Sequence, residues 1–156
     1  MNHTQQLLIV NALRAETTPA IVTALQNRDD STLLAWCNAE TATDAWNEAM
    51  TASDMFAAMD ITKFDAVTSG KRDAWRLMLQ YAPIDFGKAT ARKAIADVWG
   101  NADGVAVLTA CVRRARRAEL WLGGSVVVTN TVSATKLNVP GAISLNDLSD
   151  ALNQNP

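Results

Sequence analysis

The sequence predicts a mainly α-helical protein that ends in a β-hairpin and one more short helix. Apolar side chains recur at helical spacing through most of the chain. Pro, Gly and short polar residues mark repeated helix starts and stops. Only residues 125–139 are rich in β-branched side chains, which favour strands. We therefore expect a helical domain at residues 1–122, a β-hairpin or extended arm at 123–143, and a short helix with a tail at 144–156.

Three short helices are expected in the N-terminal third. The first covers about residues 4–13, where Leu and Val recur at helical spacing. Thr18 before Pro19 begins the second, because Thr is a favoured N-cap and Pro fits the first helical turn. Asp29 precedes the third, with acids in its favourable first turn. Residues 41–52 are weakly patterned, and we expect a short strand or an extended connection there.

The middle of the chain predicts further helices. Asp85 is expected to cap one helix, and Gly100 to end it. The longest helical region is expected from Asn101 to about Leu122, where Gly123 stops it. The expected helical segments before it are 53–60, 61–67, 71–82 and 86–100.

The C-terminal part changes character. The Val-rich and Thr-rich run after Gly124 predicts two strands joined near Asn130–Ala134. Ser144 followed by Asp147 at the third helical position resembles a capping box, which begins the last helix. An isolated hairpin is marginal in water. We therefore expect the hairpin to pack on the helices or to pair its edge with another chain.

Composition excludes much chemistry. The 156 residues are 49% hydrophobic with a net charge of −2, which excludes a disordered chain and allows one domain of ordinary size. The single histidine, His3, is terminal, and Cys37 and Cys111 are far apart in sequence. A histidine-dependent catalytic site or a four-ligand zinc site is not expected. We expect no enzyme activity, no cofactor and no metal, with Asp29 and Asp60 as helix caps. Both cysteines are expected to be buried free thiols, and a single disulfide between them is the alternative.

The sequence also predicts a soluble protein of a reducing compartment. No apolar run has the length of a bilayer span, and the N-terminus does not resemble a signal peptide.

Charge is unevenly distributed along the chain. Residues 1–60 carry two basic and eight acidic groups, residues 61–120 carry eleven and six, and residues 121–156 carry one and two. Such a pattern is complementary either within one fold or between copies of the chain.

The densest basic element, expected on a helix, has four arginines within five residues. It admits a solvated or intramolecular role, pairing with an acidic partner surface, or contact with nucleic acid. The acidic pI of 5.3 does not favour a dedicated nucleic-acid binder. The five tryptophans, spread through apolar segments, are expected to pack in a core or an interface. The candidate interface residues are Arg113, Arg114, Arg116, Arg117, Trp121, Val126, Val128, Val132 and Leu137.

Three stretches together resemble a family of small virion-associated structural proteins of tailed bacteriophages. They are MDITKFDAVTSGKRDAWRLMLQYAPIDFGKATARKAIADVWG, CVRRARRAELWLGG and VPGAISLNDLSDAL. The chain departs from the family pattern at Ala115, where members tend to have Pro, and after Gly123, where they tend to have a Thr-Gly-rich loop. The matching residues are Asp60, Ile61, Thr62, Phe64, Asp65, Gly70, Lys71, Trp75, Ile84, Asp85, Lys88, Ala89, Arg92, Ala94, Ile95 and Arg114–Glu119.

The resemblance implies a non-enzymatic structural protein, assembled in the bacterial cytoplasm and located in the virion. Its implied partners are further copies of itself and other phage structural proteins, in a ring or array at the head–tail junction (neck) or tail. The alternatives are a capsid-associated decoration protein and a small cytoplasmic regulatory or nucleic-acid-binding module. No membrane or small-molecule partner is expected.

Overall fold

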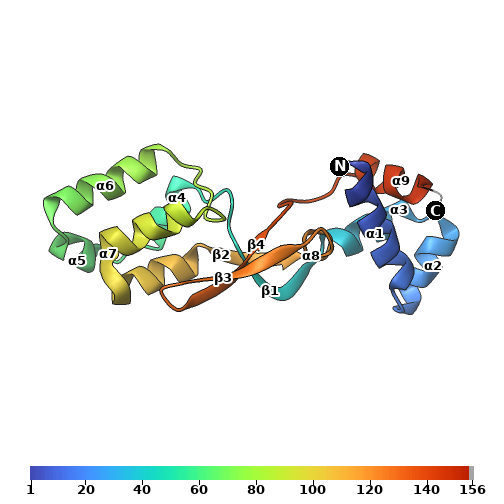
Figure 1. Cartoon of the computed structure of the whole chain (residues 1–156), viewed down its shortest axis with the longest axis horizontal. Helices are drawn as coiled ribbons and strands as arrows, with labels where there is room; N and C mark the ends of the chain where they lie inside the picture. Colours follow the sequence, from blue (N-terminus) through green and yellow to red (C-terminus); the bar gives the residue numbers. More distant parts are fainter. Residues whose placement is uncertain (155–156) are drawn as a thin grey trace. The chain divides into compact units, whose positions relative to one another are not determined.

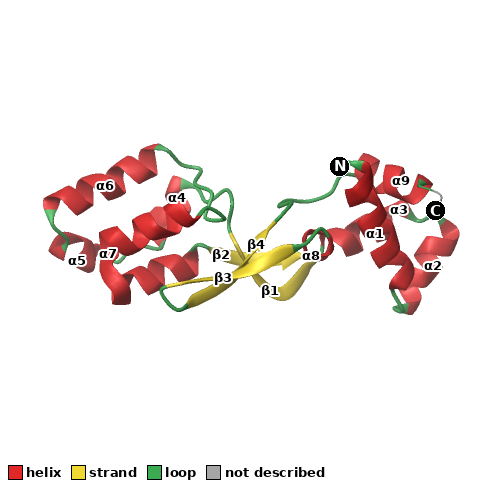
Figure 2. Ribbon diagram, viewed as in Figure 1, coloured by secondary structure: helices red, strands yellow, loops and turns green. Residues whose placement is uncertain are grey.

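The computed structural model describes residues 1–154. Helices hold 59% of the chain and a four-stranded sheet 17%, which confirms a mainly α protein (Figure 2). The helices are α1 His3–Ala15, α2 Pro19–Asn27, α3 Asp30–Asn38, α4 Ala52–Ala57, α5 Ile61–Ala66, α6 Ser69–Gln80, α7 Ala89–Ala110, α8 Arg117–Trp121 and α9 Leu145–Asn153. The strands are β1 Glu40–Trp46, β2 Val112–Arg116, β3 Gly124–Thr129 and β4 Val132–Leu137.

The chain folds into two compact units. The first contains Met1–Ala42, Arg114–Gly124 and the C-terminal segment from Leu137, and the second contains Thr43–Arg113 and Ser125–Lys136. These boundaries differ from the expected division at residues 122 and 143, because each unit is assembled from segments far apart in sequence.

The first unit has its own apolar core. Helix α1 lies beside α9, so the two ends of the described chain pack together (Figure 1). Cys37 belongs to this core as a buried free thiol, as predicted. Burial raises its pKa to about 12, against the opposing effect of Arg117. The buried core residues are Ile9, Leu13, Ile21, Ala24, Leu33, Cys37, Ala118, Leu122, Ile143, Leu148 and Ala151.

Several predicted helix starts are confirmed. Pro19 is the first residue of α2, and Asp29 caps α3 by accepting the Thr32 N–H. Ser144 and Asp147 form the expected capping box of α9. The predicted cap at Asp85 is wrong, because α7 begins at Ala89, and the Asp85 carboxylate instead accepts the N–H of Gly87.

The second unit buries three of the five tryptophans. Trp75 and Trp99 make an edge-to-face pair with ring centroids 5.2 Å apart, and Phe64 lies against Trp99. Their burial confirms the predicted packing role. The buried core residues are Trp46, Met50, Met55, Trp75, Phe86, Ile95, Val98, Trp99, Val107, Leu108, Cys111 and Ala134.

Residues 101–122 correct the sequence prediction. The region is not one helix: α7 ends at Ala110, β2 covers Val112–Arg116, and α8 begins at Arg117. The arginine element therefore lies mainly on a strand. Pairing of β2 with β1 outweighs the helix propensity of Arg, Ala and Leu, because propensity is a weak determinant beside tertiary contacts.

The sheet has the strand order β2-β1-β4-β3. Of the region 41–52, where a short strand or an extended connection was expected, only the first part is strand, because β1 ends at Trp46. The expected hairpin is matched in part: β3 and β4 are neighbours, but they belong to a four-stranded sheet. β4 runs parallel to β1, with Ala45 beside Thr135. β3 and β4 are joined by Asn130 and Thr131, which both have positive φ, as a type I′ turn requires. The hairpin thus belongs to a larger sheet, with β2 and β3 as its edges.

The fold mixes the charges that are separated along the sequence. The first unit carries five basic and seven acidic side chains, and the second carries nine of each. One ion pair in the second unit joins Arg113 to Glu48, from the basic and acidic segments respectively. The sequence polarity is therefore largely balanced within each unit.

Replacing Gly100 by Ala is expected to destabilise the second unit by about 1 to 3 kcal/mol. Gly100 interrupts α7 with φ 74° and ψ −175°, a conformation that only glycine adopts readily. An added Cβ would meet no atom within 4 Å, so the cost arises from the backbone alone. Chemical unfolding of the variant measures it. Gly70→Ala is the control, because Gly70 lies within α6 in open space, and there the change should stabilise by about 0.5 to 1 kcal/mol.

The first unit is expected to lose stability in acid, because the contacts of the Asp147 carboxylate are lost when it is protonated. The Met1 ammonium group, 2.7 Å away, and the Ser144 hydroxyl lower the pKa of Asp147 to about 2 from 3.8. The stabilisation is therefore complete above about pH 4 and is lost as the pH falls towards 2. Asp147→Asn should cost about 1 to 2 kcal/mol at pH 6 and almost nothing near pH 2. Urea unfolding across this range tests the effect, with Asp150→Asn, an exposed position on α9, as the control. A cost that does not change with pH would contradict it.

Candidate interaction surface

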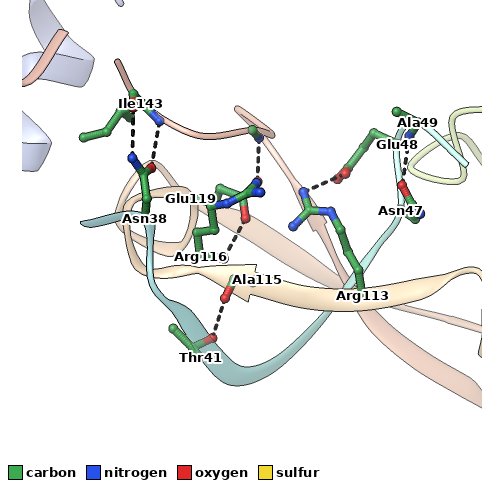
Figure 3. A network of polar contacts seen from close by, with 11 residues as sticks. Asn38, Thr41, Asn47, Glu48, Ala49, Arg113, Ala115, Arg116, Glu119 and Ile143 are labelled. Atoms are coloured by element: carbon green, nitrogen blue, oxygen red, sulfur yellow. Dashed lines mark hydrogen bonds and ion pairs between the residues drawn. The ribbon is translucent and has the colours of Figure 1, made fainter. Parts of the chain in front are cut away.

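The four arginines of the basic element do not form one patch. Three lie on β2 and one begins α8, so successive side chains point to opposite faces of the sheet. Arg113 forms an ion pair with Glu48 at 2.9 Å, with both side chains largely buried (Figure 3). Arg114 is exposed and donates to the Ala42 carbonyl at 2.7 Å.

The other two arginines organise the start of α8. The backbone N–H of Arg116 donates to the Glu119 carboxylate at 2.7 Å, and its guanidinium lies 3.8 Å from the same group. The Arg117 guanidinium stacks 3.7 Å from the centre of the Trp36 ring and donates to the Trp36 carbonyl. These contacts give the arginine element an intramolecular role.

Glu119 has a structural role in the fold that the sequence did not predict. It is fully buried, and its carboxylate also accepts the N–H of Gly141. The loop that follows is held by Asn38, whose side chain both donates to the Ile143 carbonyl and accepts the Ile143 N–H. The available signal was weak: an acid three residues after a helix N-cap.

Arg92 is the second residue whose role the sequence did not indicate. It is 3% exposed and donates to the Phe86 and Gly87 carbonyls at 2.6 and 2.8 Å, and to the Thr129 hydroxyl at 3.0 Å. Its guanidinium lies 5.0 Å from the centre of the Trp46 ring. Burial lowers its pKa, although the charge of Asp85 acts in the opposite direction. Arg92 therefore ties the start of α7 to the hairpin.

Three of the predicted interface residues pack within the fold. Leu137 is 5% exposed, Val132 packs against the core of the second unit, and Trp121 packs against that of the first. Their apolar surface is largely taken up by intramolecular packing.

Val126 and Val128, unlike these three residues, remain exposed to solvent. They are 70% and 64% exposed on β3, although both are large apolar side chains. Two residues apart on one strand, they point to the same face of the sheet. A hollow of about 230 Å³ opens beside Val126 and is lined by Thr43, Asp44, Val126, Ser133, Ala134 and Thr135. Of the predicted interface residues, these two valines present the most apolar surface.

β3 also has an uncovered edge. Within residues 1–154 it pairs with β4 on one side and with no strand on the other. An edge strand presents backbone N–H and C=O groups that another strand can pair. The segment Gly124–Thr129 contains no charged residue and no proline, the features that usually protect such edges. The β3 edge, defined as residues 125–129, is therefore the candidate interaction surface.

Within the described residues, His, Cys, Asp and Glu side chains do not gather in groups of three or more that would hold a metal ion. None of the helices in residues 1–154 combines the length and apolar character that a bilayer crossing requires. Asp60 caps a helix, as predicted: its side chain accepts the Thr62 and Lys63 N–H groups at the start of α5.

Comparison with family models, with curated proteins and with solved structures found no match to this chain.

Proposed function

We propose that this chain is a structural protein of a tailed bacteriophage particle. It self-associates and docks to other virion proteins in a ring or array at the head–tail junction or in the tail. The observation that carries the proposal is the β3 edge, an uncharged strand with Val126 and Val128 exposed. Strand addition at such an edge is a common way to join protein chains. The three sequence stretches that resemble virion-associated proteins supply the phage context.

Exposed apolar side chains on the helices of the second unit support docking to other proteins. Leu77 and Tyr81 lie one turn apart at the end of α6 and are 53% and 75% exposed. Residues four apart share one face of a helix. Phe56 and Ile61, on α4 and α5, are 58% and 57% exposed. Contiguous exposed apolar patches are typical of contact surfaces, and the neighbouring Leu77 and Tyr81 supply two such side chains on one helix face.

The arginine contacts favour assembly over nucleic-acid binding. Arg113 is committed to Glu48 and Arg117 to Trp36, so a phosphate would have to displace existing contacts. Four arginines held in different intramolecular contacts are a poor phosphate-binding surface, which needs side chains that converge on one backbone.

Quantitative mass spectrometry of gradient-purified phage particles tests the proposal. The protein should be present at a fixed number of copies per particle, and its absence from mature particles would overturn the proposal. Deletion of its gene separates two locations. Full heads without tails would indicate the head–tail junction, whereas unstable capsid shells would replace the neck assignment with a decoration role.

A further inference from the structure

β3 and β2, the two edges of the sheet, differ in chemistry. β2 carries Arg113, Arg114 and Arg116, and charged residues protect an edge from pairing. β3 carries Ser, Val and Thr only between Ser125 and Thr129. Pairing β3 with the β2 edge of a neighbour would place uncharged residues opposite arginines, and β3 offers no acidic side chain to meet them. The chemistry therefore favours a partner strand that resembles β3 itself.

The hairpin geometry determines which backbone groups face outward. A two-residue type I′ turn makes Thr129 and Val132 the closing hydrogen-bonded pair of an antiparallel ladder. Alternation along the ladder then directs the backbone N–H and C=O groups of Val126 and Val128 away from β4. The outward backbone groups thus belong to the two exposed valines.

The sequence of β3 is self-complementary about Val127. In an antiparallel pair of two β3 strands centred there, Val126 lies opposite Val128 of the other copy, and Ser125 lies opposite Thr129. The outward backbone groups of Val126 meet those of Val128 in the other strand, so the hydrogen bonds of the new ladder are complete. Four valines form one apolar patch on the exposed face, and cross-strand pairs of β-branched residues are stabilising.

We propose that two copies of this chain pair through their β3 edges, antiparallel and centred on Val127, to form one continuous eight-stranded sheet. This inference rests on the proposed function, which it deepens by naming the self-association surface. The two-fold interface joins copies in pairs. Further assembly into a ring then uses other surfaces, such as the exposed apolar face of α6.

Cysteine cross-linking of the full chain tests the register. Val127→Cys should give a cross-linked dimer under mild oxidation, because Cα atoms of a non-hydrogen-bonded antiparallel pair lie about 4.5 Å apart. Ser125→Cys alone should not cross-link, because two Ser125 residues would be separated by about 13 Å along the strands. A mixture of Ser125→Cys and Thr129→Cys chains should cross-link efficiently. Native Cys37 and Cys111 are buried, and the unmodified chain is the background control.

Charge substitution tests the same interface in solution by light scattering. The wild-type chain should be dimeric or larger at tens of micromolar. The double variant Val126→Lys, Val128→Lys should shift to monomer while its circular dichroism stays unchanged, because both positions are exposed. Mixing it with Val126→Glu, Val128→Glu should restore a mixed dimer. Leu77→Lys, exposed on α6, should leave the β3 pair intact.

Several results would overturn the inference. They are a monomeric wild-type chain, an unchanged dimer in the double-lysine variant, or equal cross-linking of Ser125→Cys alone and of the mixture. Capture of β3 only by a strand of another virion protein, without the Val127→Cys dimer, would also overturn it. Failure of the virion role is distinguishable, since the protein would then be absent from particles while its β3 dimer still formed.

Discussion

Replacing Arg92 by Ala is expected to destabilise the second unit by about 3 to 4 kcal/mol. The substitution leaves the Phe86 and Gly87 carbonyls without their donor and opens a cavity beside Trp46. Buried polar groups without partners cost about 1 to 3 kcal/mol, and the cavity adds to that cost. Urea unfolding followed by tryptophan fluorescence measures the loss, since Trp46, Trp75 and Trp99 all report on this unit.

Two further variants identify the origin of the effect. Arg92→Lys keeps the charge but lacks the planar donor fork, so it should lose about 1 to 3 kcal/mol. Lys93→Ala is the matched control, because the Lys93 side chain is 73% exposed and pairs with Asp97 of the same helix. It should change stability by less than about 0.5 kcal/mol. Equal losses for Arg92→Ala and Lys93→Ala would contradict the assigned role.

Helix starts and chain reversals were predicted well where neighbouring residues determine them. The starts at Pro19 and Ser144 and the pairing of β3 with β4 follow from residues within a few positions of each other. Each such signal acts over a single turn of helix or a single reversal of the chain. These features therefore agree between sequence and structure. At Gly100, where a helix end was predicted, the helical conformation is interrupted, but α7 continues to Ala110.

The features that the sequence did not indicate depend on distant partners. β2 is a strand because β1, about seventy residues earlier, pairs with it: the Asn47 N–H donates to Cys111 at one end and the Arg117 N–H to Ala39 at the other. Arg92 and Glu119 are charged residue types that are usually exposed. Their burial depends on carbonyls and N–H groups that tertiary folding brings to them. Local sequence therefore gives no signal for the burial of Arg92 and only a weak one for the role of Glu119.

β3 shows what the sequence and the structure each contribute to the evidence for an interface. The Val-rich and Thr-rich run after Gly124 predicts two strands that either pack on the helices or pair an edge with another chain. Only the sheet order shows that β4 uses one edge of β3 and leaves the other uncovered in the described chain. The candidate list of nine interface residues then reduces to Val126 and Val128, because the others contribute mainly to contacts within the chain.

Glu119→Ala is expected to cost the first unit about 3 to 5 kcal/mol. The carboxylate is fully buried and accepts the N–H groups of Arg116 and Gly141. Its removal leaves both donors without that acceptor and leaves the Arg116 guanidinium without the negative charge 3.8 Å away. Chemical unfolding gives the size of the loss. Glu40→Gln, at an exposed position on β1, is the control and should fall within about 0.5 kcal/mol of wild type.

Glu119→Gln separates the charge from the hydrogen bonds. An amide has the same shape but offers one acceptor oxygen and presents an NH₂ group to the second donor. The variant should therefore lose about 1 to 3 kcal/mol, between wild type and Glu119→Ala. Hydrogen exchange should quicken at Gly141 and Ile143, in the loop that Glu119 and Asn38 hold, while α6 in the second unit stays unchanged. Equal losses for Gln and Ala would mean that the negative charge, rather than the geometry of its bonds, holds this loop to α8.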